Sequence, residues 1–373
     1  MIEYSWIEDI AQFRAVAPKW DEAVIRSGNH NPFLLSDFVS TWWKHFYKNR
    51  QLRVLSIYNN NEILGGIPLC LERGSGRFGF ARLLRHVGGA AANYAEPLYV
   101  TPEAKVLPYL CEALAKKNDW DVLCLTDVPA GSPLIEEARR SVSNGNFSLS
   151  ITHSHMNWAI DLAGGIEDYL FTIPNKLRRH LRAKRKYAFQ HYGEVKLRAI
   201  KGREEVEQYF DLFVRFSRDS FSARNRRSSF ENPEQAAFFR EFLALMEEKQ
   251  KLDAHALIAG EKVLAISFGY RFGKGFNWVL TGFNYDYSDL NPGYLLIEEL
   301  IWEITRRGET YYNWYGHGQF YKTQWCNKQS PLYRFVLVRP TWKGLCYQAC
   351  QWAEKALRSN QVVVNLLRKA KRA

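Results

Sequence analysis

The segment from residue 311 to residue 325 (YYNWYGHGQFYKTQW) gathers side chains that could move protons or hold an anionic oxygen. Two glycines flank His317, so a tight loop would display its imidazole, and Tyr321 and Lys322 follow shortly after. An imidazole, a phenol and an ammonium could deprotonate an amine, protonate a leaving thiolate or bind an oxyanion. The pattern predicts catalytic roles for His317, Tyr321 and Lys322; a surface loop with a hydrogen-bonded histidine is the alternative.

A second candidate site lies at the start of the helix predicted after Asn291. Asn291 suits the N-cap, Pro292 suits the first helical position, and Gly308 suits the C-terminal end. Gly293 leaves the backbone of the first turn bare, so an anion could approach its N–H groups and the positive end of the helix dipole. The spacing predicts a pyrophosphate site; an ordinary capped helix is the alternative.

A run of cations covers residues 176–186 (KLRRHLRAKRK) on a predicted helix. Such a helix cannot be buried. Its cations either face solvent or bind an anionic partner, which could be a phosphate-bearing ligand, a nucleic acid or an anionic membrane. Aromatic residues are not interleaved, which argues against stacking on single strands. A second basic cluster spans residues 215–227. The candidate substrate-binding arginines are Arg178, Arg179, Arg182 and Arg218.

The predicted helices and strands around these segments follow one another in a similar order in the first and second halves of the chain. In the first 155 residues we expect helices at 10–27, 36–46 and 105–117, a hairpin with its turn at Asn59 to Asn61, and a strand at 121–128. The second cycle brings the basic helix, a strand at 195–200, two helices, three strands, the helix after Asn291 and a strand at 310–316. This shared order predicts α/β (α+β) layers in two duplicated domains.

Composition and charge exclude several classes of protein. The 373 residues are 46% hydrophobic and 24% charged, which excludes a disordered, collagen-like or coiled-coil chain. Lys and Arg number 51 against 39 Asp and Glu, and the formal charge of +12 indicates anionic partners. The N-terminus lacks a basic start followed by an apolar stretch, and no run of ~18 apolar residues occurs, so we expect a cytoplasmic protein without a targeting segment.

Metal binding is not expected. The six cysteines show no CxxC spacing, so reduced thiols are the expected state and a zinc site is not. His153 and His155 lie on one face of a predicted strand, but no third ligand is evident. Residues 341–373 are predicted to form a basic amphipathic helical tail, which either docks on its own domain or contacts a membrane surface.

These segments together resemble a known family. NPFLLSDFVSTWWKHF and LGGIPLCLER are similar to the N-terminal half of CelD-like bacterial acetyltransferases of the GNAT superfamily, often associated with cellulose or exopolysaccharide synthesis. The basic helix, SFENPEQAAFFREFL, LAISFGYRF, the NPG helix start and Tyr321-Lys322 with Trp325 extend the resemblance over most of residues 20–340. The family is similar in fold to the Fem-type aminoacyltransferases, which carry two GNAT-like domains.

The resemblance implies two tandem GNAT-like (acyl-CoA N-acyltransferase) domains, at residues 1–155 and 156–340, before the tail at 341–373. It implies transfer of an acyl group from acetyl-CoA or another acyl-CoA to an amine, with no metal. It makes the NPG segment the coenzyme A pyrophosphate site and places the 311–325 loop, with Trp325 as a substrate contact, near the transfer centre. The implied cofactor-binding residues are Asn291, Pro292, Gly293, Tyr294 and Leu295.

The sequence departs from the family at the loop. Relatives usually have Asp where Asn313 stands and carboxylates before Tyr-Lys, where this chain has Gly316-His317-Gly318-Gln319. A carboxylate base is therefore not expected, and we expect His317 to replace it, beside Asn313. Acyl-CoA aminolysis needs little more than a held thioester, a neutral amine and an oxyanion donor, so catalysis by positioning alone is an alternative, as is loss of activity.

Three functions follow as hypotheses. The first is an N-acyltransferase for an amino sugar or another cell-envelope or exopolysaccharide precursor, since aromatic residues, 15% of the chain, suit sugar faces. The second is a Fem-type transferase that uses aminoacyl-tRNA, favoured by the basic charge but not by the single basic helix, because the Fem-type arm is a long helical hairpin. The third is a non-catalytic scaffold for polysaccharide synthesis, docked on anionic lipid at the inner face of the cell membrane beside a polysaccharide synthase. The altered loop and the basic tail favour it.

Overall fold

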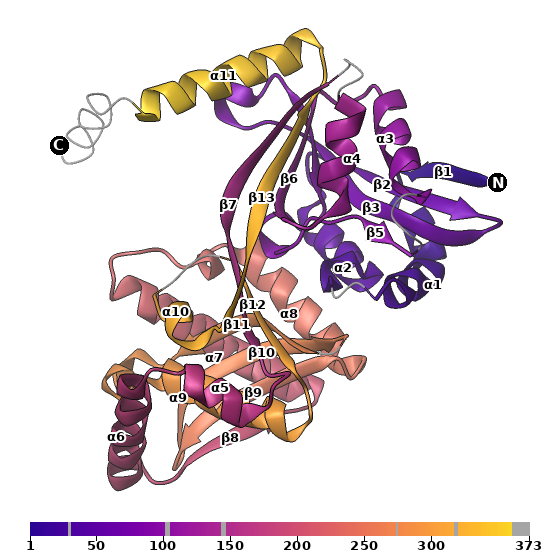
Figure 1. Cartoon of the computed structure of the whole chain (residues 1–373). Helices are drawn as coiled ribbons and strands as arrows, with labels where there is room; N and C mark the ends of the chain where they lie inside the picture. Colours follow the sequence, from indigo (N-terminus) through magenta and orange to yellow (C-terminus); the bar gives the residue numbers. More distant parts are fainter. Residues whose placement is uncertain (29–30, 101–104, 143–146, 274, 317–319, 360–373) are drawn as a thin grey trace. The chain divides into compact units, whose positions relative to one another are not determined.

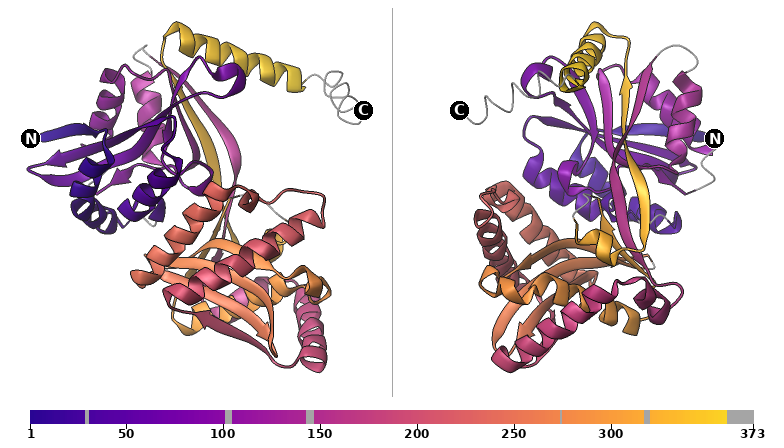
Figure 2. Two further views of the ribbon diagram at one scale, coloured as in Figure 1. Left: turned by 180° about the vertical axis from the view of Figure 1, so that it is seen from behind. Right: turned by 60° about the vertical axis from the view of Figure 1, so that its left-hand side comes forward.

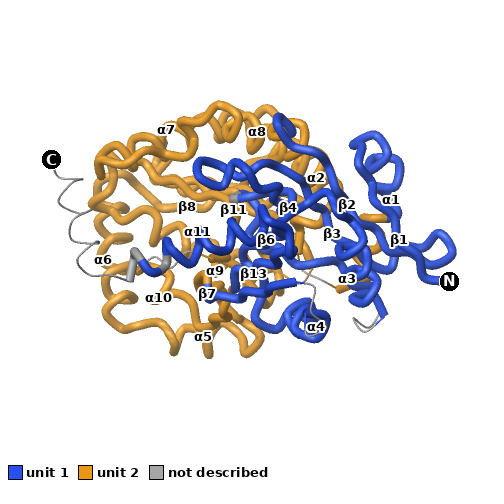
Figure 3. The backbone as a smooth tube through the Cα atoms, turned by 90° about the horizontal axis from the view of Figure 1, so that it is seen from above, with its two compact units in different colours: residues 1–19, 47–153, 333–373 blue, residues 20–46, 154–332 orange. Residues whose placement is uncertain are grey.

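The computed structural model describes residues 1–28, 31–100, 105–142, 147–273, 275–316 and 320–359. It mixes helices and strands as the sequence predicts, and the chain divides into two compact units (Figure 1, Figure 3). Unit 1 contains residues 1–19, 47–153 and 333–373, and unit 2 contains residues 20–46 and 154–332. Among the described residues, no helix is long and apolar enough to cross a lipid bilayer.

Unit 1 is a mixed sheet with flanking helices. Its strand order is β1-β2-β3-β4-β6-β13, with β5 paired to β3; β1 to β4 are antiparallel neighbours, and β4 and β6 are parallel. The elements are β1 (Ile2–Ile7), α1 (Ile10–Arg26, whose last turns belong to unit 2), β2 (Arg50–Asn59), β3 (Glu62–Arg73), β4 (Arg82–His86), β5 (Leu98–Tyr99), α3 (Leu107–Lys116), β6 (Val122–Pro129), α4 (Pro133–Val142), β7 (Ser148–Asp161), β13 (Lys328–Val338) and α11 (Trp342–Ser359).

Unit 2 has the same kind of sheet. Its strand order is β8-β9-β10-β11-β12-β7, antiparallel from β8 to β11, with β11 and β12 parallel. Helices α7 and α8 lie across one face (Figure 2). The elements are α2 (Ser36–Phe46), α5 (Ile166–Thr172), α6 (Asn175–Tyr192), β8 (Val195–Ile200), α7 (Arg203–Ser222), α8 (Pro233–Glu248), β9 (Leu252–Ala259), β10 (Lys262–Phe272), β11 (Gly275–Phe283), η6 (Tyr285–Leu290), α9 (Pro292–Arg306), β12 (Tyr311–Tyr315) and α10 (Lys322–Trp325).

The duplicated order predicted from the sequence is present. The run β1-α1-α2-β2-β3-β4 matches β8-α7-α8-β9-β10-β11, and in each run a helix (α3 or α9) then leads to a strand parallel to the one before it. The predicted hairpin turn is also present, because Asn60 and Asn61 between β2 and β3 have φ of 47° and 71°, which asparagine tolerates well. Helices α4 and α5 were not among the predicted elements.

The two units are not contiguous stretches of chain, unlike the expected ranges 1–155 and 156–340. Residues 20–46 belong to unit 2 because the Phe38 ring of α2 packs at 5.9 Å from Phe238 and 5.6 Å from Phe242 of α8. The end of β13 and α11 belong to unit 1, where Tyr347 of α11 is buried against residues of β4 and β6. Aromatic contacts between segments that are distant in the sequence thus decide which unit each segment belongs to.

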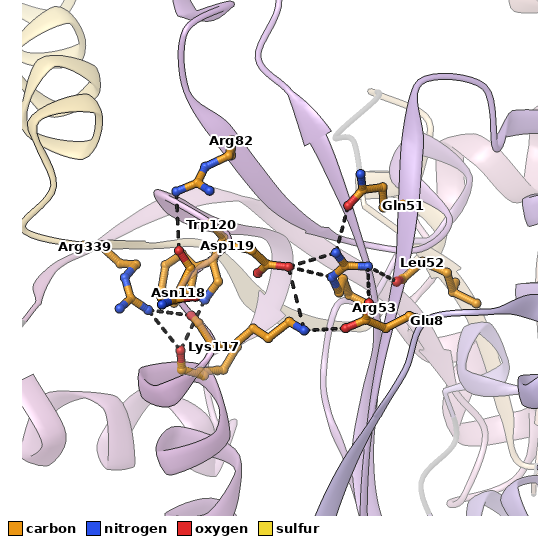
Figure 4. A network of polar contacts seen from close by, with 11 residues as sticks. Glu8, Gln51, Leu52, Arg53, Arg82, Lys117, Asn118, Asp119, Trp120 and Arg339 are labelled. Carbon is orange, nitrogen blue, oxygen red and sulfur yellow. Dashed lines mark hydrogen bonds and ion pairs between the residues drawn. The ribbon is translucent and has the colours of Figure 1, made fainter.

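A polar network anchors one edge of unit 1 (Figure 4). Arg53 of β2 is buried, and its guanidinium contacts Asp119 at 2.8 Å and Glu8 at 3.2 Å. Lys117 pairs with the same Glu8, and Arg339, beyond β13, donates to the Lys117 carbonyl at 2.6 Å. The network therefore joins β1, β2, β13 and the connection between α3 and β6.

Replacing Arg53 by leucine should lower the free energy of unfolding by about 2 kcal/mol, because the carboxylates of Asp119 and Glu8 lose their shared partner in a partly buried setting. Urea unfolding of both proteins measures the change. Arg139→Leu, which breaks an exposed pair with Glu136, is the control and should cost under ~0.5 kcal/mol. Equal effects of the two substitutions would contradict the role given to the network.

Candidate functional site

The parallel strands β11 and β12 separate after a short contact. Among the residues that the structure describes, they pair at Gly275 with Tyr311, Phe276 with Tyr312 and Asn277 with Asn313. Beyond this point β11 runs on toward α9, and Val279 is an extra residue of β11 relative to β10, a β-bulge. Backbone groups on the facing edges beyond Asn277 are therefore not used by a β11–β12 ladder. Such an opening between parallel strands can accept the amide groups of an extended ligand.

Aromatic rings that follow the last paired residues pack together in the core of unit 2. Trp278 of β11 lies 4.8 Å from Trp314 of β12, and the Tyr321 ring lies 5.8 Å from Trp314 and 6.2 Å from Trp278 between ring centroids. Burial raises the pKa of the Tyr321 phenol well above its usual range. Tyr321 is therefore neutral at physiological pH, where it can donate a hydrogen bond but cannot serve as a base.

Lys322, which the sequence predicts to be catalytic, is buried and donates hydrogen bonds to backbone carbonyl groups. Its Nζ donates to three carbonyl oxygens in a row, those of Trp314 at 2.9 Å, Tyr315 at 3.3 Å and Gly316 at 2.8 Å. Burial lowers the pKa of Lys322 to about 8. Because all three donors of an ammonium are used in this way, Lys322 shapes the end of β12 rather than facing a substrate.

Asn313 also shapes the strand end. Its Oδ1 accepts the backbone N–H of Tyr315 at 3.1 Å, across a register shift in the pairing of β12 with β7. Tyr315 has φ of 54°, a strained value for a residue with a large side chain. Its hydroxyl donates to Asn277 Oδ1 at 2.9 Å and lies 3.3 Å from the Tyr270 hydroxyl. The amide of Asn313 cannot take up a proton, so no base stands at this position.

A histidine that the sequence analysis considered only as a metal ligand lies at this strand end. His155 of β7 shares a hydrogen bond of 2.9 Å with Ser154 Oγ, and a methyl group added to Gly316 would lie 1.9 Å from His155 Nε2. His317, the predicted catalytic histidine, lies outside the described residues. Among those that are described, no group of three or more His, Cys, Asp or Glu side chains could hold a metal ion.

The start of α9 is open, but it is not capped as predicted. Asn291 has φ of 51°, and its side-chain amide contacts His180 Nε2 of α6 at 2.8 Å instead of capping the helix. A methyl group on Gly293 would meet nothing nearer than Phe283 Cδ1 at 4.0 Å. Pro292 has no N–H, and the Tyr294 N–H donates to the Asn291 carbonyl at 2.9 Å. The Gly293 N–H, at the positive end of the helix dipole, is therefore the donor of this bare turn that fits a phosphate. The guanidinium of Arg224 lies 5.9 Å from the Phe283 ring centroid, which adds positive charge nearby.

The other residues predicted to bind the donor differ in their burial and contacts. Pro292 and Leu295 are buried, and Leu295 belongs to the hydrophobic core of unit 2. The Tyr294 hydroxyl donates to Gln324 Oε1 at 3.0 Å, and its ring lies 6.1 Å from Trp325. Only the backbone of the first turn and the half-buried Tyr294 are therefore placed to meet a ligand here.

The predicted substrate-binding residues do not form one site. Trp325 is buried in the core of unit 2, and Arg218 donates to the Phe230 carbonyl at 2.9 Å. Arg178 of α6 bonds to Asn175 at its own helix start. Arg179 and Arg182 of α6 are exposed, and neither forms an ion pair with another described residue. The spacing of these residues in the sequence predicts that the arginines lie on helices, but it does not predict which groups they contact.

A cavity of about 410 Å³ lies elsewhere in unit 2, at the starts of β11 and β12. Arg271, Gly275 and Glu309 are among its lining residues, and burial raises the pKa of the Glu309 carboxyl. The paired part of β11 and β12 separates this cavity from the end where the strands diverge. It is therefore not part of the site at the start of α9.

Comparison with known proteins identifies the class. Residues 175–323 match the family model described as an acetyltransferase (GNAT) domain. This part of unit 2 is therefore a GNAT-type acetyltransferase domain, and the chain is an acyltransferase by class. The matched range includes α6, the diverging strands, the start of α9 and Lys322. No curated protein matches the chain in sequence.

Solved structures share the fold. A conserved protein from Bacteroides thetaiotaomicron VPI-5482 has a TM-score of 0.56 and 13% identity, covering 91% of this chain and 100% of that one. FemX has a TM-score of 0.61 and 10% identity over 93% and 99% of the two chains. L-PGS from Bacillus licheniformis has a TM-score of 0.51 and 11% identity over 87% and 91%. At such low identity the likeness concerns the fold alone.

The Lys322 ammonium should make stability depend on pH. Its pKa is about 8 in the folded protein, against 10.5 ordinarily, so the unfolded state binds more protons between these values and stability should rise with pH there. We expect the difference in unfolding free energy between wild type and Lys322→Met to grow in favour of the wild type from pH 8 to 10.5. Chemical unfolding across this range measures it, with Lys262→Met as the control. A flat difference would contradict a buried ammonium.

Gly316→Ala should displace the imidazole of His155, because the added methyl group overlaps Nε2. We expect a loss of about 1 kcal/mol in unfolding free energy, which should vanish when His155 is also replaced by alanine. A double-mutant cycle of urea unfolding measures this coupling. Gly131→Ala is the control, since a methyl group there meets nothing within 4 Å. Equal losses in both backgrounds would show that the ring does not rest on Gly316.

Proposed function

We propose that the protein is an N-acyltransferase that moves an acyl group, acetyl in the first instance, from acyl-CoA to the amine of an amino sugar or a related cell-envelope or exopolysaccharide precursor. The observation that carries this proposal is the bare first turn of α9 at Gly293, which follows the strand that diverges from β12. The matched acetyltransferase domain and the CelD-like sequence resemblance support it.

The donor would lie along this opening. Its pyrophosphate would accept a hydrogen bond from the Gly293 N–H at the start of α9, near the Arg224 guanidinium. Its amide-bearing arm would run between the diverging edges of β11 and β12, where backbone donors and acceptors can pair with it. The thioester would then reach the region of Val279, Tyr321 and Gly316, at the inner end of the opening.

The transfer needs few groups. The neutral amine nitrogen attacks the thioester carbonyl carbon, the C–N bond forms, and the C–S bond then breaks. We assign oxyanion binding to backbone N–H groups at the Val279 bulge and stabilisation of the leaving thiolate to the neutral Tyr321 phenol. The amine proton would pass to the histidines around Gly316, His155 and His317, in place of the missing carboxylate.

The acceptor and location are proposed on less specific grounds. Phe320 is 78% exposed directly before Tyr321, so it offers a ring face on which a sugar could stack. A precursor of this kind is assembled at the inner face of the cell membrane, where we place the protein. We also propose that unit 1 is a second GNAT-like domain, because it repeats the element order and the parallel strand pair of unit 2.

A second candidate function is Fem-type transfer from aminoacyl-tRNA. One observation favours it: the outer face of α6 carries cations that make no ion pair among the described residues, and phosphates of a nucleic acid could bind them. They are Lys176, Arg179, Arg182 and Lys186. In this case binding of tRNA would weaken steeply as salt is raised.

Calorimetric titration with acetyl-CoA tests the proposed donor site. Gly293→Glu should abolish binding, because a carboxylate would occupy and repel the phosphate position. The fold should remain intact, since the position has room for a side chain and a negative charge in the first turn of a helix is favourable. Gln235→Glu adds the same charge to the first turn of α8 and should leave binding unchanged.

Each outcome of the titration separates the candidates. Binding by the wild type and the Gln235 variant, with none by the Gly293 variant, supports an acyl-CoA transferase. Equal binding by all three proteins would show that the donor does not bind at the start of α9. Absence of binding to acyl-CoA of any chain length, with salt-sensitive binding of aminoacyl-tRNA, would favour the Fem-type alternative. Binding of neither would leave the non-catalytic scaffold.

A further inference from the structure

The outer face of helix α11 in unit 1 is apolar. Its exposed residues recur at helical spacing, so they share one face. Trp342 and Trp352 are each 67% exposed and Leu345 is 54% exposed, the highest values among those large hydrophobic residues of α11 whose exposure the structure describes. The face consists of Trp342, Leu345, Cys346, Ala349, Trp352, Ala353 and Ala356.

The inner face of α11 is the more polar one. Gly344 packs so closely that a methyl group there would lie 2.3 Å from the Arg339 carbonyl oxygen. Gln348 donates to Ser148 Oγ at 2.6 Å, Gln351 donates to the hydroxyl of the buried Tyr347 at 2.9 Å, and Glu354 pairs with Arg77. The helix is therefore held in one orientation, with its apolar side turned to solvent, the reverse of an ordinary surface helix.

The charge near this face indicates which kind of partner could bind to it. Lys343 lies over the Trp342 ring, with Nζ 5.6 Å from its centroid. After Glu354 the sequence contains six cations and no acid: Lys355, Arg358, Arg368, Lys369, Lys371 and Arg372. A second copy of the chain seated on α11 would bring two such sets of cations together, which is unfavourable. An anionic lipid surface complements both the cations and the tryptophans, which favour the level of lipid headgroups.

We propose that the apolar face of α11 docks the protein on an anionic lipid bilayer, with Trp342, Leu345 and Trp352 inserted at headgroup depth. The helix would lie in the plane of the surface, and the following cations would bind lipid phosphates. This gives the membrane location a defined surface and partner. It does not depend on acyl transfer, because α11 and the α9 site belong to different units.

Vesicle co-sedimentation tests the docking surface. The full chain should bind vesicles of phosphatidylcholine with phosphatidylglycerol, and bind pure phosphatidylcholine vesicles much more weakly. The double substitution Trp342→Gln with Trp352→Gln should weaken binding roughly tenfold or more, since both side chains leave the interface. The matched control replaces Ile25 and Tyr47 by glutamine. These two residues are 64% and 52% exposed and are not part of α11, so this variant should bind as the wild type does.

Two results would overturn the proposal: no binding of the wild type to anionic vesicles, or equal loss of binding in the control variant. If the wild type instead forms dimers that the tryptophan variant lacks, and neither binds vesicles, α11 is a self-association surface and the proposal fails. Acetyl-CoA titration of the tryptophan variant is run alongside. It should match the wild type, so failure of the acyl-CoA proposal and failure of docking remain distinguishable.

Discussion

The candidate site depends on how the end of β12 is held away from β11. Parallel strands that continue side by side would satisfy each other's backbone groups and leave no opening. Here the Lys322 ammonium gathers the carbonyls of three successive residues, and Asn313 fixes the N–H of Tyr315, whose positive φ turns the chain. The strained turn persists because these bonds over-determine it. The open edges beyond Asn277 and the position of Gly316 beside His155 both follow from this turn.

The two units share one order of elements, and local packing explains why they differ. In unit 1 the parallel strands β4 and β6 also pair over three residues, and α3 corresponds to α9. The start of α3, however, is filled by Val106, which is fully buried, and a methyl group on Gly65 would lie 2.5 Å from its side chain. The start of α9 has a bare glycine instead. An anion could therefore approach the helix start in unit 2, whereas core packing closes the equivalent one in unit 1.

The residues of the candidate site differ in how far local sequence could place them. Gly293 depends on local backbone chemistry, and the structure leaves its turn bare. Asn291, Lys322 and Trp325 were assigned by residue type, and their roles depend on partners that lie elsewhere: His180, three strand carbonyls and the core of unit 2. His155 was visible in the sequence, but its neighbour Gly316 is distant in the chain, so nothing local could indicate their contact.

The sequence by itself determined most of the helices and strands, the hairpin turn between β2 and β3 and the repeated order of elements, because hydrophobic periodicity and turn residues act over a few positions. It also determined the excess of positive charge. Tertiary structure alone decided that residues 20–46 pack in unit 2, that β7 and β13 serve both units, and that α11 turns its apolar face outward. Those outcomes rest on contacts between segments far apart in the chain, which no local pattern of residues encodes.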